Sequence, residues 1–157
     1  MELVLLPHVG AGPFRLGMTV DEARAAARGL GRIAGQEADA PRPGQLVVVH
    51  DGFGLDHTLG FRSGRLVQVE VWRFRDEDAD VRVTLDGTDV FRTRHKKLRK
   101  RLGDLGHTVE TEYRDMPCDA LPELNVILAN ESSFEYPTDW RGHPLHYDYV
   151  LLADRIA

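Results

Sequence analysis

Two stretches of alternating side chains, separated by a two-residue turn, constrain the fold of this chain most. Every second position in residues 55–61 is apolar except His57, and every second position in residues 67–71 is valine. Ser63 and Gly64 lie between them, and a short turn containing glycine between two such runs is typical of a β-hairpin. One face of this hairpin is apolar and the other is polar, which predicts an antiparallel sheet with one buried face.

The rest of the chain contains further segments with strand patterns. Each is short and rich in β-branched or alternating apolar residues. These segments are residues 3–6, 46–49, 81–85, 109–113, 124–129 and 146–153.

Two helices are expected between these strands. Thr19 and Glu22 form the Thr-x-x-Glu capping box, and apolar residues then keep helical spacing until Gly31. A second helix is expected after residues 86–89, whose Asp and Thr side chains supply caps, and Gly103 ends it. Its narrow apolar stripe consists of Phe91, His95, Leu98 and Leu102.

These elements predict a single α+β domain over residues 1–157. We expect an antiparallel sheet of about six to seven strands with two main helices on one face, because this arrangement buries the apolar face of every element. The order of elements also indicates two halves, residues 1–78 and 79–157, each with one helix followed by three strands. Residues 16–19 align with residues 85–88. Few positions are identical, so a duplication and a simple recurrence of helix and strands both stay open.

Composition and cysteine content bound the class of protein. A length of 157 residues with 42% hydrophobic and 29% charged residues suits one globular domain. Cys118 is the only cysteine, so the fold does not depend on an internal disulfide or an oxidising compartment. The apolar run at residues 3–6 is too short for a signal peptide, and no stretch approaches the roughly 20 apolar residues of a membrane span. We therefore expect a cytoplasmic protein with no membrane partner.

Positive charge is concentrated in the second expected helix. Seven of the 20 Lys and Arg residues lie in residues 92–101, with no acid among them. The rest of the chain holds the other 13 together with all 25 Asp and Glu residues. A basic segment of this kind is either a solvated helix face or a binding surface for an acidic protein, while the acidic body disfavours nucleic acid. The candidate partner-binding cations are Arg92, Lys96, Lys97, Arg99 and Lys100.

The two tryptophans are further candidates for partner binding. Trp72 falls on the polar face of its expected strand, and Trp140 lies in an expected loop. Both positions favour partial exposure, and exposed tryptophans commonly anchor protein interfaces.

No catalytic, metal or cofactor motif stands out. His146 and Asp148 share one face of an expected strand, but the spacing places no third metal ligand. Cys118 has no nearby base, and the Gly-x-Gly pair at residues 10–12 lacks the third glycine of a dinucleotide loop. An alternative hypothesis is a small-molecule site or an enzyme pocket between the sheet and loop 34–44, formed by His57, His146 and Asp148. A structural role for each of these side chains is the simpler interpretation. The sequence thus predicts no cofactor.

Residues 14–22, Phe-Arg-Leu-Gly-Met-Thr-Val-Asp-Glu, resemble a family of small, mostly uncharacterised bacterial cytosolic proteins. The resemblance continues at residues 52–57, 63–67 and 85–91, and it involves turn and capping residues rather than an active site. It implies that the chain could act as an immunity protein, since some members are thought to neutralise a toxin by binding it. The Leu-Gly-Met-Thr-x-x-Glu helix start is also similar to that of outer-membrane assembly lipoproteins and of β-lactamase inhibitor protein, which implies a shared scaffold.

The leading hypothesis from sequence is a non-enzymatic, immunity-like protein-binding module. Its partner would be an acidic protein or a toxin, and the chain itself would be a monomer or a homodimer joined through a strand edge.

Overall fold

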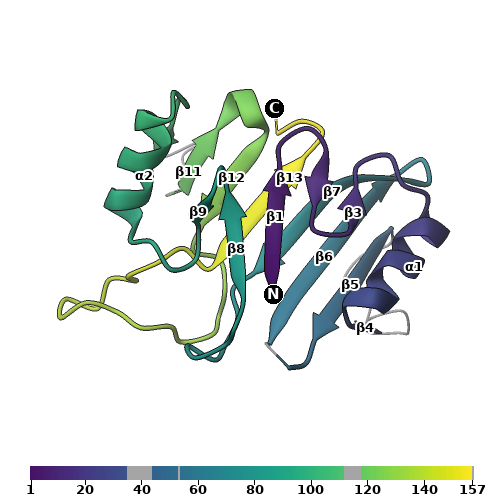
Figure 1. Cartoon of the computed structure of the whole chain (residues 1–157), viewed down its shortest axis with the longest axis horizontal. Coiled ribbons are helices and arrows are strands. Elements are labelled where there is room, and N and C mark those ends of the chain that lie inside the picture. The colour runs from purple at the N-terminus through teal and green to yellow at the C-terminus, as the bar shows by residue number, and fades with distance from the viewer. Residues whose placement is uncertain (35–43, 53, 112–117, 157) are drawn as a thin grey trace.

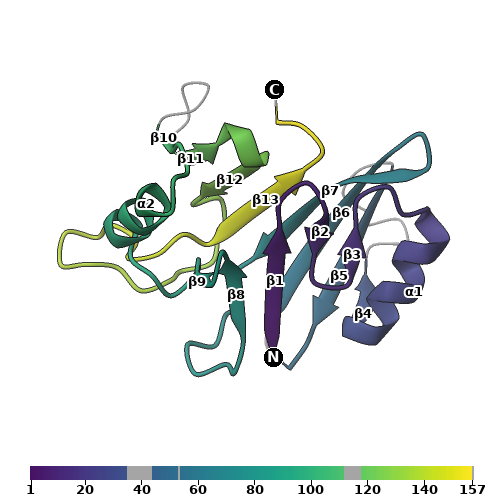
Figure 2. The same cartoon turned by 45° about the horizontal axis from the view of Figure 1, so that its top comes forward.

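Two β-sheets and two α-helices form layers in the part of the chain that the structure describes (Figure 1). The computed structural model describes residues 1–34, 44–52, 54–111 and 118–156. The small sheet and both helices lie on the same side of the large sheet, with the small sheet between the helices (Figure 1 and Figure 2). Most of the loop predicted at residues 34–44 falls outside the described residues.

The large sheet has eight strands in the order β10-β11-β12-β13-β7-β6-β5-β4, and every neighbouring pair is antiparallel. The predicted hairpin forms its β6–β7 pair. Ser63 and Gly64 have φ angles of 54° and 75°, the left-handed values that a tight hairpin turn needs. The strands are β4 (Arg32–Ala34), β5 (Gln45–His50), β6 (Leu55–Arg62), β7 (Arg65–Trp72), β10 (Glu110–Thr111), β11 (Cys118–Leu121), β12 (Val126–Ala129) and β13 (Tyr149–Ala153).

The small sheet has five strands in the order β3-β2-β1-β8-β9. Its central pair, β1 with β8, is parallel, whereas its other pairs are antiparallel. The strands are β1 (Glu2–Leu6), β2 (Gly10–Ala11), β3 (Phe14–Arg15), β8 (Arg82–Leu85) and β9 (Thr88–Asp89).

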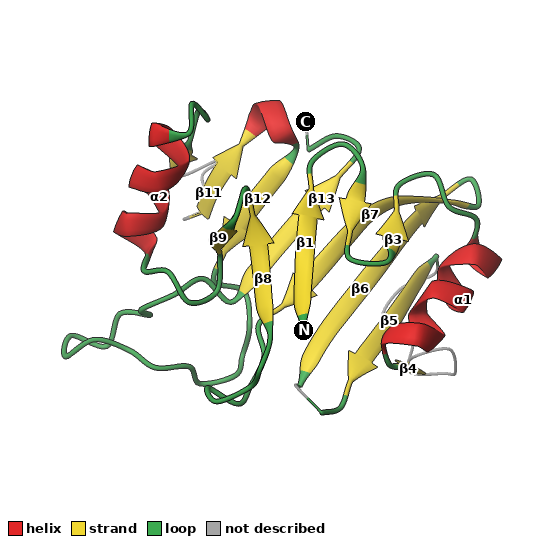
Figure 3. Cartoon of the chain, in the orientation of Figure 1, coloured by secondary structure: helices red, strands yellow, loops and turns green. Residues whose placement is uncertain are grey.

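The prediction of one sheet with six to seven strands is therefore wrong, because strands dominate the fold and they divide into two sheets (Figure 3). The predicted strands at residues 3–6 and 81–85 belong to the small sheet instead of extending the large one. Their alternation correctly indicates one buried face, since Leu3 and Leu5 are buried while Val4 and Leu6 are partly exposed. Alternation does not show which strand a segment pairs with, and that choice depends on distant parts of the chain.

The predicted pattern of one helix followed by three strands is also wrong. In the described residues, four strands of the large sheet follow each helix, β4 to β7 after α1 (Val20–Leu30) and β10 to β13 after α2 (His95–Asp104). The additional strands β4 and β11 have three and four residues, which is too short for an alternating pattern to be recognised.

Helix α1 begins and ends as predicted. The Thr19 hydroxyl accepts a hydrogen bond from the backbone amide of Glu22, and the Glu22 carboxylate accepts one from the Thr19 amide in return. Ala23 and Ala27 are fully buried, so the helix lies close to β4 and β5. Gly31 ends the helix where a Cβ atom would lie 2.2 Å from the carbonyl oxygen of Val49, so no larger residue fits there.

Helix α2 begins six residues after the predicted cap. Asp86 and Gly87 have positive φ angles and form the turn between β8 and β9, and Thr88 pairs with Leu85 across that turn. The prediction that residues 86–89 open the helix is therefore wrong, because Asp-Gly is a hairpin-turn sequence as well as a capping one. The backbone instead enters the helix at Arg94, which has no side-chain hydrogen bond to the helix.

The main core lies between the two sheets and beneath α1. Leu3, Val69, Val83 and Val150 are buried in this one cluster, so residues from both ends of the sequence contribute to it. Neither α-helix in the described ranges has the length and apolar character needed to cross a membrane.

Candidate functional site

Helix α2 presents two contrasting faces. Leu98 and Leu102 are buried against the protein. Four cations at the start and on the outer side of the helix are exposed, and none of them forms a hydrogen bond or an ion pair with another described residue. We call these four the basic surface: Arg94, Lys96, Lys97 and Arg101.

The positive charges at the N-terminus of α2 destabilise the helix. The first turn contains no acid, and Arg94, Lys96 and Lys97 place positive charge where the helix dipole is already positive. Only Arg101, the basic residue in the last turn of α2, stands where a cation interacts favourably with the helix dipole. Helix α1 shows the usual arrangement, with Asp21 and Glu22 in its first turn.

The loop between β12 and β13, residues 130–148, carries the most exposed tryptophan of the described chain. Trp140 is 87% exposed, and the guanidinium of Arg141 lies 4.7 Å from the centre of its ring. The Asp139 carboxylate accepts hydrogen bonds from the backbone amides of His143 at 2.9 Å and Arg141 at 2.8 Å, which fixes the turn. These bonds, first that of His143, lower the pKa of Asp139.

The loop tip and the basic surface are neighbours. Loop 130–148 runs past the N-terminal end of α2 and extends beyond the large sheet (Figure 1 and Figure 2). The positive charge of Arg94 acts on both Asp139 and His146, and it contributes to the lowered pKa of each. An exposed aromatic ring and unpaired cations thus lie at one end of the molecule.

Not all of the cations predicted to bind a partner are available. The Arg92 guanidinium donates to the backbone carbonyls of Val81 and Ala79 and lies 4.1 Å from the centre of the Phe74 ring. It therefore holds the chain that precedes β8. Lys100 forms an exposed ion pair with Asp104 at 2.8 Å, whereas the predicted candidates Lys96 and Lys97 belong to the basic surface.

Trp72 lies apart from this end of the molecule. It is on β7 next to Val71, a core residue, so its ring points to the face of the large sheet opposite the helices. Its ring meets the Tyr149 ring edge-on at 4.8 Å and is partly buried there. The structure therefore brings Trp140, and not Trp72, close to the basic surface.

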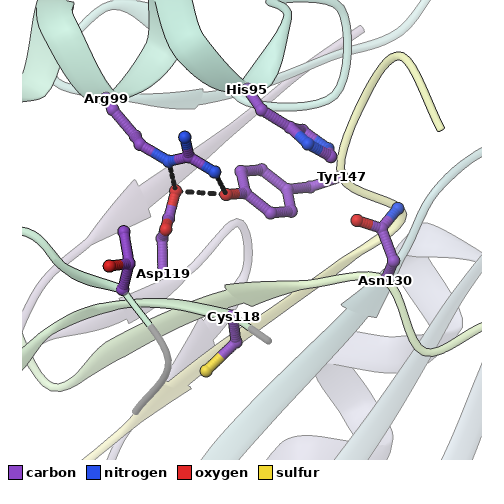
Figure 4. Close-up of a pocket in the computed structure, with 7 residues that line it drawn as sticks. His95, Arg99, Cys118, Asp119, Asn130 and Tyr147 are labelled. Atoms are coloured by element: carbon purple, nitrogen blue, oxygen red, sulfur yellow. Dashed lines mark hydrogen bonds and ion pairs between the residues drawn. The ribbon is translucent and has the colours of Figure 1, made fainter. Parts of the chain in front are cut away.

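A pocket of about 370 Å³ lies behind α2 (Figure 4). Asp119 on β11 is buried at its base, and its Oδ2 accepts hydrogen bonds from Arg99 Nε at 2.7 Å and from the Tyr147 hydroxyl. Burial, followed by the hydrogen bond to Asp119, raises the pKa of Tyr147, so this hydroxyl stays protonated. The pocket is lined by His95, Arg99, Thr111, Cys118, Asp119, Asn130 and Tyr147.

His95 and Tyr147 form one wall of this pocket. Their rings stack with centres 3.9 Å apart and planes inclined by 22°. Burial lowers the pKa of His95, so the imidazole is neutral at neutral pH. Its Nε2 is buried without a hydrogen-bond partner among the described residues. Sequence reasoning had assigned His95 to the apolar stripe and had missed Asp119 and Tyr147 entirely, because nothing near them in sequence marks them as partners.

Loop 130–148 encloses a second pocket of about 430 Å³, and Asp148 lies at its wall together with Phe134 and Tyr136. The Asp148 carboxylate accepts hydrogen bonds from the backbone amides of Glu131 and Ser132, at 2.8 and 3.2 Å. It is buried, so its role in the loop is to fix the exit from β12.

The alternative site of His57, His146 and Asp148 is not assembled in the described residues. His57 is fully buried on β6, beside the Phe14 ring, and burial lowers its pKa to about 3. Neither of the two pockets is lined by His57 or His146. The part of the hypothesis that involves loop 34–44 lies almost wholly outside the described residues.

Within the described ranges, no cluster of three or more His, Cys, Asp or Glu side chains has the arrangement of a metal site. No family model matches the chain, and no curated protein or solved structure shows significant similarity to it. The resemblances drawn from residues 14–22 therefore stay predictions, and the case for function rests on the geometry of α2, loop 130–148 and the pocket behind them.

Proposed function

We propose that this chain is a cytoplasmic, non-enzymatic protein-binding module that uses the basic surface and Trp140 to bind an acidic protein. The observation that carries the proposal is the start of α2, where cations stand at an uncapped helix N-terminus with no described partner. Such an arrangement destabilises the helix by itself. Sequences that break a local stability rule commonly do so at functional sites.

An acidic partner would supply the negative charge that the N-terminus of α2 lacks. Carboxylates placed near Lys96 and Lys97 would interact favourably with both side chains and with the helix dipole. The acidic remainder of the chain would repel the same partner elsewhere, so the charge asymmetry orients the encounter. Nucleic acid fits less well, because its extended phosphate backbone would also meet the acidic body.

Trp140 supplies the apolar part of the contact. An exposed tryptophan buries a large area in an interface, and such residues are enriched among those that dominate binding energy. The Asp139 turn holds the backbone around it, so little conformational freedom is lost on binding. A toxin is the partner class that the family resemblance implies.

Photo-crosslinking in the native host tests this proposal. A benzoylphenylalanine in place of Arg141, next to Trp140, should capture a protein with an acidic surface. The double substitution Lys96→Glu and Lys97→Glu should abolish the capture and should weaken binding of the purified partner at least about tenfold, with the wild-type affinity falling as salt increases.

Arg28→Gln is the matched control. It removes an exposed cation from the other helix, α1, and should leave capture unchanged. Capture that survives the double charge reversal would contradict the proposal, as would crosslinks that contain only nucleic acid.

A further inference from the structure

The pocket behind α2 has unused hydrogen-bonding groups that the proposed protein interface does not involve. Arg99 uses Nε to bind Asp119, and its Nη2 lies 3.5 Å from the Tyr147 hydroxyl. Its Nη1 has no hydrogen-bond partner in the described part of the chain. The His95 Nε2 is likewise unpartnered among the described residues, but it is buried inside the pocket wall and does not face a ligand.

Asp119 and Tyr147 hold the arginine in place. The buried Asp119 carboxylate binds one edge of the guanidinium, so the plane of Arg99 is fixed and its other edge stays free (Figure 4). A guanidinium edge of this kind matches a carboxylate, which accepts two parallel hydrogen bonds from it. The His95 ring stacks on Tyr147 and closes this wall of the pocket.

The charge of the pocket selects among anions. Arg99 and Asp119 have opposite charges that nearly cancel, and the other lining side chains are His, Thr, Cys, Asn and Tyr. This balance accommodates a single negative charge better than the two charges of a phosphate monoester.

We propose that this pocket binds a small monocarboxylate, with its carboxylate on the free edge of Arg99. The volume of about 370 Å³ lies at the lower end of the range for ligand pockets, which fits a small metabolite. Thr111 and Asn130 lie at the pocket wall and offer polar groups for a hydroxyl or amide on the same ligand.

An NMR titration of the labelled full chain tests the site, with acetate, propionate and lactate as probes and with inorganic phosphate for comparison, all at constant ionic strength. The signals of the Arg99 Nε–H group and the His95 ring should shift and saturate with at least one monocarboxylate. Arg99→Lys keeps a charge beside Asp119 but removes the planar edge. Arg99→Lys should weaken binding at least about tenfold, as for a lost hydrogen bond to a charged group. His95→Phe keeps the ring stack that closes the pocket wall, and it should leave the affinity unchanged.

Lys100→Gln, on the same helix but outside the pocket, should leave the affinity unchanged. Thr111 is exposed on β10, so its substitution should not disturb the fold. Thr111→Val should weaken the binding of lactate more than that of acetate, because only lactate carries a hydroxyl. The proposal is overturned if no monocarboxylate saturates, if phosphate binds as tightly, or if the folded Arg99→Lys and Thr111→Val proteins both bind like the wild type. These outcomes are independent of the crosslinking result, since the residues involved differ.

Discussion

At the scale of single residues, His57 stands out as a polar group with no described hydrogen bond in the centre of the large sheet. It pairs on β6 with Val48 and Val71, and neither ring nitrogen has a partner. A buried imidazole without partners lowers stability compared with an apolar side chain of similar size. It also makes the fold sensitive to acid, because the buried ring resists protonation.

The lowered pKa of His57 makes the stability of the protein depend on pH. The pKa of His57 is lowered to about 3 in the folded state, while the unfolded value is near 6.5. Protonation linked to His57 therefore costs little stability above pH 6.5, and it lowers the free energy of unfolding progressively as the pH falls from 6.5 toward 3. Between pH 7 and pH 5 we expect it to reduce the free energy of unfolding by about 2 kcal/mol.

His57→Leu should remove this loss and raise the free energy of unfolding at pH 7 by about 1–3 kcal/mol. Urea unfolding of both proteins at pH 7 and pH 5 measures the difference, and comparison with wild type separates His57 from the other histidines. A variant that loses as much stability between the two pH values as the wild type would show that His57 is not the responsible group.

At the scale of elements, the two helices begin in opposite ways. Helix α1 has a complete capping box and two acids in its first turn, all of it readable from neighbouring residues. Helix α2 has an uncapped Arg94 followed by cations. The first-turn residues of α1 stabilise that helix, whereas those of α2 destabilise it. The cations at the start of α2 therefore indicate a role other than helix stability.

Arg94→Asp should stabilise the protein by about 1–2 kcal/mol, because the new carboxylate can cap the first amides and interact favourably with the dipole. The same substitution should weaken partner binding. Thr19→Ala, at the corresponding position of α1, should instead destabilise by about 1 kcal/mol. Urea unfolding compares all three proteins, and an unchanged stability for Arg94→Asp would remove the energetic argument for a functional α2.

At the scale of the whole molecule, two strand pairings connect residues 1–78 with residues 79–157. β1 pairs with β8 in the small sheet, and β7 pairs with β13 in the large sheet. A fragment of residues 1–78 would lose both pairings and expose two strand edges together with half of the core. The halves proposed from sequence are thus interlocked in the structure.

We expect that neither fragment, 1–78 or 79–157, shows a cooperative unfolding transition when it is expressed separately. Mixing the two fragments should restore a circular dichroism spectrum typical of strands. Thermal unfolding monitored by circular dichroism tests this expectation. Cooperative unfolding of either fragment alone would contradict it and would show that one half has a sufficient core.

The candidate site was predictable only in part. The run of cations at residues 92–101 is visible in the sequence, and Lys96 and Lys97 lie on the basic surface as exposed side chains. The sequence did not separate them from Arg92 and Arg99, because helical spacing does not reveal that Arg92 meets backbone carbonyls or that Arg99 meets Asp119. Those contacts join residues that are brought together only by sheet formation.

The sequence by itself determined the β6–β7 hairpin and the capping box of α1, because each depends on residues a few positions apart. The tertiary structure alone decided that strands 3–6 and 81–85 form a second sheet, since strand pairing is a long-range choice that alternation leaves open. It also decided that Asp119, Arg99 and Tyr147 share one pocket and that loop 130–148 runs past the N-terminal end of α2. Side chains distant in sequence acquire a common environment only when the sheets pack and bury them together.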